Sequence, residues 1–162
     1  MLSWYVFPEP SGSFAAAASK CSAASGGRYK ININLLSTQS DQQRVSLVRR
    51  LAAKDSSIDI LAMDVDWTAE FAAAKWIRPW PANLAAQVTQ GDLPGPVATA
   101  TVQGHLFAAP VNSNTQLLWY RKDLVPTPPK TWTEMIDDAI KLAKQGKPHY
   151  IEEQGAQYEG LT

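Results

Sequence analysis

The sequence predicts an α/β fold, with a doubly wound parallel sheet and helices on both of its faces. Short apolar segments alternate with longer segments of helical periodicity through the first half of the chain. Polar loops that contain proline, glycine or serine separate these segments. The chain has 162 residues, of which 45% are hydrophobic, enough for a globular core. Because an alternation of strand and helix brings each new strand back in the same direction, we expect a parallel sheet.

Three strands and two helices are expected in the first half. In chain order they are strand 2–7, helix 14–24, strand 29–36, helix 42–54 and strand 58–65. The first strand is aromatic and ends at Pro8, and the second alternates polar and apolar side chains. The Gly26-Gly27 pair ends the first helix, and apolar residues at helical spacing define the second.

The second half is less regular. We expect short helices at residues 68–74, 84–88 and 96–101, strands at 104–110, 116–121 and 149–152, and the start of a helix at 160–162. The pattern at residues 131–145 predicts an amphipathic helix, with Thr131 or Thr133 near its N-terminus and Gly146 after its end.

Composition argues against several classes of function. Lys and Arg number 15 and Asp and Glu number 15, so the formal charge of zero gives no electrostatic reason to bind nucleic acid. The single cysteine, Cys21, cannot form an internal disulfide or a cysteine-based metal site. No nucleotide-binding glycine motif and no hydrolase nucleophile motif occurs. We therefore expect no cofactor, no metal ion and no nucleic-acid partner.

The loops that follow the expected strands are the first candidates for a ligand site. In open α/β sheets, ligands bind beyond the carboxyl ends of the strands, here at residues 7–13, 37–43 and 64–69. Asp64 and Asp66 lie in the third of these loops. They could act as an acid/base pair, accept hydrogen bonds from sugar hydroxyls, or cap the next helix, and we favour sugar binding by Asp64.

Aromatic and neutral polar residues also suit a sugar. Trp67, beside the acidic loop, is a candidate to stack on a sugar ring. The other tryptophans whose surroundings predict packing are Trp4, Trp76, Trp119 and Trp132. Residues 111–116 carry amides and hydroxyls, which fit a neutral, hydroxyl-rich ligand, although an ordinary solvated loop has the same composition.

Several motifs along the chain carry a family resemblance. They are Leu-Phe-Ala-Ala-Pro at residues 106–110, Asn-Thr-Gln-Leu-Leu-Trp-Tyr-Arg-Lys-Asp-Leu at 114–124, a proline-rich turn with Thr-Trp-Thr-Glu at 131–134, and Gln-Tyr-Glu-Gly-Leu at 157–161. Asp59-Ile60 with Asp64 fits the same pattern. The chain resembles the family 1 extracellular solute-binding proteins of ABC sugar importers. Residues 93–100 and 109–121 are most similar to a trehalose-binding lipoprotein of that family.

This resemblance implies a type II periplasmic-binding-protein-like fold whose two lobes close on a sugar. The implied function is non-enzymatic: the substrate-binding component of an ABC transporter captures a disaccharide, trehalose, outside the membrane and delivers it to the permease. A lipid anchor on the cell membrane is implied as well. The alternatives are a receptor for maltose or another oligosaccharide or polyol, and a glycoside hydrolase that uses Asp64 with Asp66 or Glu9.

The resemblance also implies site residues. Asp64 and Asn114 match residues that contact trehalose, and Gln43 is a weaker third match. Glu9 lies in the corresponding first loop, and Trp67 matches in residue type.

The implied domain organisation is that of a fragment. Residues 1–110 correspond to an incomplete N-terminal lobe, 111–115 to the crossover between lobes, and 116–162 to the truncated start of the second lobe. Such a fragment exposes unpaired strand edges and apolar surface. We therefore expect it to bind sugar weakly or not at all alone, and to associate with the remaining C-terminal part or with itself.

Overall fold

The computed structural model describes residues 1–153 and divides the chain into two compact units. Unit 1 is Met1–Ser113, and unit 2 begins at Asn114. The division falls within residues 111–115, the segment expected to cross between lobes. The assignment of the units to two lobes stays a prediction.

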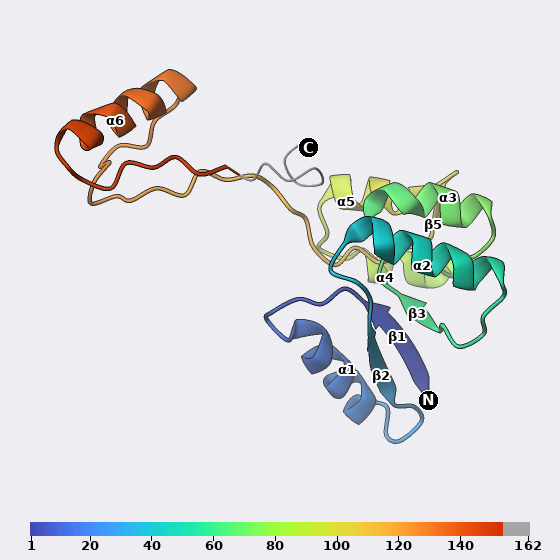
Figure 1. Ribbon diagram of the computed structural model, residues 1–162. Coiled ribbons are helices and arrows are strands. Elements are labelled where there is room, and N and C mark those ends of the chain that lie inside the picture. The colour runs from blue at the N-terminus through green and yellow to red at the C-terminus, as the bar shows by residue number, and fades with distance from the viewer. Residues whose placement is uncertain (154–162) are drawn as a thin grey trace. The chain divides into compact units, whose positions relative to one another are not determined.

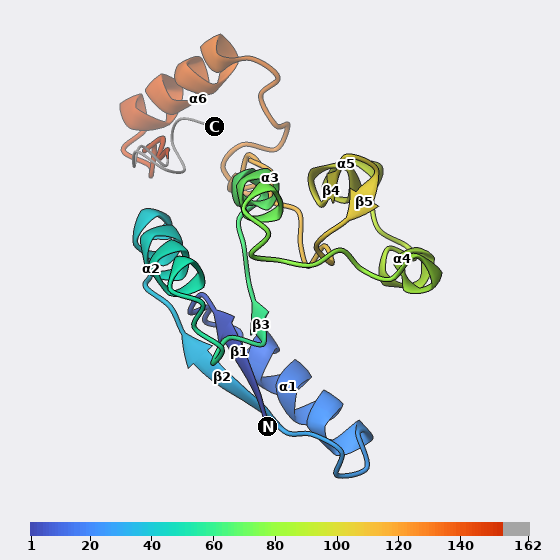
Figure 2. The ribbon, with the colours of Figure 1, turned by 90° about the vertical axis from the view of Figure 1, so that its right-hand side faces the viewer.

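Unit 1 is built on a three-stranded parallel sheet with the strand order β2-β1-β3. The strands are β1 (Leu2–Val6), β2 (Ile31–Leu35) and β3 (Ile60–Leu61). Helices α1 (Ser13–Ala24) and α2 (Ser40–Ala52) lie on opposite faces of this sheet (Figures 1 and 2). The expected α/β architecture, a parallel sheet with helices on both faces, is confirmed.

Alternation along β1 sends side chains to both helical layers. Trp4 packs edge-to-face on Phe14 of α1, with 5.3 Å between the ring centroids. Tyr5, the next residue, faces α2, where the Arg50 guanidinium lies 4.9 Å from its ring centroid. Since neighbouring side chains in a strand point to opposite faces, one short strand contributes to both layers.

The core of unit 1 lies between α2 and the segment that follows β3. This segment forms a 3₁₀ turn, η1 (Val65–Trp67), and a short helix, α3 (Thr68–Ala73). Leu47 of α2 and Phe71 of α3 are fully buried, and Trp67 stacks on Phe71 with 6.1 Å between centroids. Leu61 packs against this cluster from the sheet. Apolar burial therefore fixes the chain immediately after Asp64 against α2.

The remainder of unit 1 consists of short elements. They are α4 (Ala82–Val88), α5 (Pro94–Thr99), β4 (Thr101–Val102) and β5 (His105–Leu106). The expected helix at 96–101 was wrong at its end, because Thr101 belongs to β4, and the expected strand at 104–110 shrinks to β5. The reason is a tight hairpin: Gln103 and Gly104 both have positive φ, 49° and 78°, which pairs Thr101 with Leu106.

Unit 2 contains one long helix among its described residues, α6 (Trp132–Lys144). The Thr131 hydroxyl accepts a hydrogen bond from the Glu134 backbone N–H at 3.1 Å, and the Glu134 carboxylate accepts one from the Lys130 N–H at 2.6 Å. Gly146 ends the helix in the left-handed region, with φ 67°. The helix expected at 131–145 is confirmed, with Thr131 as its cap.

The strand predictions of the second half were largely wrong. Residues 116–121 and 149–152 form no strand, and β3 covers only part of the expected strand 58–65. A strand needs a hydrogen-bonded partner, and within the described residues these segments have none along a ladder. The expected helix start at 160–162 and the motif at 157–161 lie outside the described residues.

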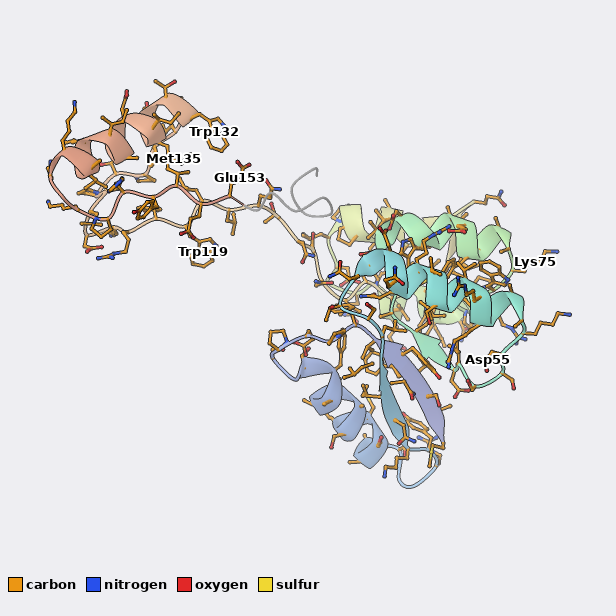
Figure 3. The ribbon with its side chains drawn as sticks, viewed as in Figure 1. Asp55, Lys75, Trp119, Trp132, Met135 and Glu153 are labelled. Atoms are coloured by element: carbon orange, nitrogen blue, oxygen red, sulfur yellow. The ribbon has the colours of Figure 1, made fainter. Side chains whose placement is uncertain are left out.

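Two of the tryptophans expected to pack are on the surface instead. Trp119 is 89% exposed and Trp132 is 63% exposed, and both project away from the body of unit 2 (Figure 3). Met135, in contrast, lies between α6 and the extended chain (Figure 3). The packing predicted for Trp4 and Trp76 is confirmed by their contacts with Phe14 and Phe71.

Over residues 1–153, no helix combines the length and the apolar character needed to cross a membrane. The same residues contain no group of three or more His, Cys, Asp or Glu side chains arranged to hold a metal ion.

Candidate functional site

The candidate site of unit 1 lies where the three parallel strands end. Their carboxyl ends meet at one edge of the sheet, and the loop after each strand begins there. Glu9 lies in the loop after β1, Gln43 in the first turns of α2 after β2, and Asp64 in the loop after β3. Three of the five predicted residues are thus brought to this edge by the topology alone.

Asp64 is half-buried and is held by a serine from the neighbouring loop. The Ser40 hydroxyl donates a hydrogen bond of 2.6 Å to Asp64 Oδ2. Asp64 has extended backbone and directly precedes η1, but neither η1 nor α3 receives a side-chain cap hydrogen bond. The capping role considered for this carboxylate is therefore wrong, and its oxygen instead links β3 to the start of α2.

Gln43 is buried, and its amide holds the loop after β2. Gln43 Nε2 donates a hydrogen bond of 2.8 Å to the Ser37 carbonyl. A buried amide that bonds its own loop stabilises the loop conformation. Its predicted contact with the ligand remains a prediction.

Glu9 accepts three hydrogen bonds at the start of α1. They come from the Ser11 N–H at 2.8 Å, the Ser13 N–H at 2.6 Å and the Ser13 hydroxyl at 2.9 Å. Hydrogen bonding from Ser11, and then from Ser13, lowers the pKa of the Glu9 carboxyl to about 2, against the opposing effect of burial. The N-cap residue Gly12 has no side chain, so Glu9 supplies the negative charge that favours this helix end.

Trp67 and Asn114 have different surroundings. Trp67 is only 3% exposed and packs in the core beside Phe71, so the protein itself covers its ring. Asn114 is exposed in an irregular segment and belongs to unit 2. The expected polar loop at 111–116 is confirmed as chain without regular secondary structure.

Sequence reasoning missed an ion pair beside the site. Arg44 of α2 binds Glu70 of α3 through two contacts, Nε to Oε2 at 2.9 Å and the terminal nitrogen to Oε1 at 2.6 Å. The hydrogen bonds that Arg44 donates to Glu70 raise the pKa of Arg44 further above its usual range. Helical spacing alone could have indicated that Ser40 and Arg44, one turn apart, share a face of α2.

The polar groups at this edge are of the types that suit a hydroxyl-rich molecule. It offers carboxylates, amides and serine hydroxyls, which accept and donate hydrogen bonds at a half-buried sheet edge. Asp66, the second residue of the candidate acid/base pair, is exposed on η1.

Comparison with known proteins gives consistent results. A profile of the family described as bacterial extracellular solute-binding protein matches residues 15–160. A probable ABC transporter-binding protein of Deinococcus radiodurans is 30% identical over 134 residues, which cover 76% of this chain and 31% of that protein. The sn-glycerol-3-phosphate-binding periplasmic protein UgpB of Yersinia enterocolitica is 46% identical over 50 residues, which cover 26% of this chain and 11% of that protein.

Two solved structures share the fold. Maltose-bound T. maritima MalE3 matches with a TM-score of 0.63 at 24% identity, covering 90% of this chain and 39% of its own. The maltotriose-bound maltotriose-binding protein of Thermus thermophilus matches with a TM-score of 0.64 at 19% identity. The match covers 88% of this chain and 37% of that protein. The chain thus spans about a third of the length of the Deinococcus protein and of these two structures. Since the family profile covers most of its residues, the chain belongs to the bacterial extracellular solute-binding protein family.

Proposed function

We propose that this chain forms one side of the sugar site in the substrate-binding component of an ABC importer. The observation that carries the proposal is the Asp64 carboxylate, held by Ser40 at the carboxyl edge of a parallel sheet. A carboxylate fixed in this way accepts hydrogen bonds from neighbouring hydroxyls of a sugar. Membership of a family of binding proteins agrees with the expectation that the chain is not an enzyme.

Trehalose is the ligand we propose. The motifs at residues 93–100 and 109–121 support it, because they are most similar to a trehalose-binding member of the family. The solved neighbours hold maltose and maltotriose, which makes a maltose-type sugar the alternative. The glycerol-3-phosphate-binding relative makes a smaller polyol derivative a further candidate ligand, although its similarity covers only 26% of this chain.

Within this proposal, Asp64 and Asn114 are the residues expected to contact the sugar. Gln43 and Glu9 keep the neighbouring loops in place, as their hydrogen bonds to Ser37 and to the start of α1 indicate. Trp67 supports the Asp64 loop from the core side, because its ring is buried against Phe71. Closure of two lobes around the ligand would then present the sugar to a permease.

The partners and location follow from the same proposal. The binding component works outside the cytoplasmic membrane with permease subunits, and a lipid anchor would keep it there. Because the chain spans 31% of its Deinococcus relative, we also propose that it associates with the remainder of such a protein or with a second copy of itself.

Isothermal titration calorimetry on the protein as its gene encodes it tests the proposal. We expect trehalose to bind without release of glucose, and maltose and sn-glycerol 3-phosphate to bind more weakly. Turnover of trehalose would refute the receptor function. Tighter binding of maltose would change the ligand and leave the class unchanged.

The Asp64→Ala variant locates the site. Loss of a hydrogen-bonded charge is expected to weaken sugar binding by about 1.5–3 kcal/mol. Asp66→Ala is the matched control, because Asp66 is exposed two residues away, and it should bind as the parent protein does. Equal affinity of Asp64→Ala and the parent would show that the site lies elsewhere.

A further inference from the structure

The start of α2 makes three side-chain links, two of them to loops of the candidate site and one to α3. Ser40, Gln43 and Arg44 have the spacing i, i+3 and i+4, so they lie on one face of the helix. Ser40 binds Asp64, Gln43 binds the Ser37 carbonyl, and Arg44 binds Glu70. The links reach forward to the β3 loop and back to the β2 loop.

Only one of these links ends on a residue of the proposed sugar contact. The Arg44–Glu70 pair joins α2 to α3, beyond the core residue Trp67. The Gln43 amide bonds backbone within its own loop. Ser40, in contrast, places its hydroxyl 2.6 Å from the carboxylate oxygen of Asp64.

The geometry of the Ser40 bond constrains the carboxylate. A serine hydroxyl has one proton to donate, and here it is directed at Oδ2 of Asp64, so this oxygen acts as an acceptor. Ser40 itself is the first residue of α2, whose position is fixed by Leu47, which is buried in the core about two turns further along the helix. The donor is therefore held by a rigid element, and rigid support of a binding group reduces the entropy lost on binding.

We propose that Ser40 is a positioning residue that orients the Asp64 carboxylate for sugar recognition, an inference that rests on the proposed function of Asp64. Ser40 sets the direction of one carboxylate oxygen without being required for the fold. A purely structural role would instead make Ser40 equivalent to Arg44, which also ties α2 to the segment after β3.

Three substitutions in the gene-encoded protein separate these roles. Ser40→Ala removes the donor, Ser40→Thr keeps it, and Arg44→Gln breaks the neighbouring link without touching Asp64. We expect Ser40→Ala to lower trehalose affinity about 5- to 10-fold by calorimetry, as loss of one hydrogen bond predicts. Ser40→Thr should bind as the parent does, and Arg44→Gln should lower the melting temperature while leaving the affinity unchanged.

The outcomes also distinguish this inference from the proposed function. If Asp64→Ala weakens binding and Ser40→Ala does not, Ser40 has no positioning role and the sugar site stands. Equal losses of affinity in Ser40→Ala and Arg44→Gln would likewise overturn positioning, because they would show general support of the loop. If Asp64→Ala binds normally, or if no sugar binds the parent, both the site and the role of Ser40 are refuted.

Discussion

At the scale of single residues, serines hold both carboxylates of the candidate site. Ser40 donates to Asp64, and Ser11 and Ser13 donate to Glu9. The carboxylates could be predicted from the sequence, because acidic residues after strands in an α/β pattern indicate a ligand edge. Their partners could not, because Ser40 and Asp64 are 24 residues apart and meet only when α2 packs beside β3.

Glu9 predicts a pH dependence of stability. Its pKa is lowered from 4.5 to about 2 in the folded chain, so folding is favoured by the charged form. This contribution is fully present above pH 4.5 and is lost as the pH falls towards 2. In urea titrations, Glu9→Gln should therefore be less stable than the parent near neutral pH, and the difference should shrink across that acid range.

Ser11→Ala provides the graded control for Glu9. It keeps the carboxyl group and the Ser11 N–H donor but removes the Ser11 hydroxyl, whose hydrogen bonding is the first cause of the lowered pKa of Glu9. The loss of stability near neutral pH should therefore be smaller than in Glu9→Gln and should shrink over the same acid range. If the difference in unfolding free energy between Glu9→Gln and the parent stays constant from neutral to acid pH, the stabilising role of the charged carboxylate is contradicted.

At the scale of elements, the long helices followed their local signals, whereas only the two strands that pair along their full length, β1 and β2, formed as expected. The helices α1, α2 and α6 begin and end within about two residues of the expected positions, since caps, glycines and apolar spacing act locally. The apolar runs at residues 116–121 and 149–152 indicate strands, but strand formation depends on a partner elsewhere. In the β4–β5 hairpin the partner is supplied locally. The two-residue turn Gln103-Gly104 pairs β4 with β5, a pairing that the composition of these residues did not indicate.

The cap of α6 gives a test at this scale. Thr131→Ala removes the acceptor for the Glu134 N–H and should destabilise the helix by about 1 kcal/mol. Thr133→Ala, at the second residue of the helix, is the control and should have little effect. Amide hydrogen exchange of the first turn of α6 measures the difference, and equal protection in the two variants would exclude the cap.

At the scale of the whole molecule, unit 2 has more exposed apolar surface than its few elements can cover. Trp119 and Tyr150 are 89% and 84% exposed, and Trp132, Ile136 and Ile140 of α6 are exposed at a spacing of four residues. Such a stripe along a helix favours contact with another protein surface. This agrees with a chain that spans about a third of the length of the Deinococcus protein and of the two solved structures.

The exposed stripe of α6 predicts association of the 162-residue chain on its own. Light scattering should show oligomers whose share grows with protein concentration. Replacing Ile136 and Ile140 together by glutamine should reduce the share, because it removes apolar area that association would bury. Leu93→Gln, an exposed apolar residue of unit 1, is the matched control. A monomer at every concentration would refute self-association.

The sequence by itself determined the class of fold, the edge of the sheet where a ligand site is expected, and the acidic residues at that edge. These follow from periodicity and from strand-end position, both of which are local properties of the chain. Only the tertiary structure decided which of these residues are anchored, and by what. Packing buried Trp67 and Gln43, joined Ser40 to Asp64, and left Trp119 and Trp132 exposed. Burial and long-range hydrogen bonds depend on which elements become neighbours, and no single segment of the sequence carries that information.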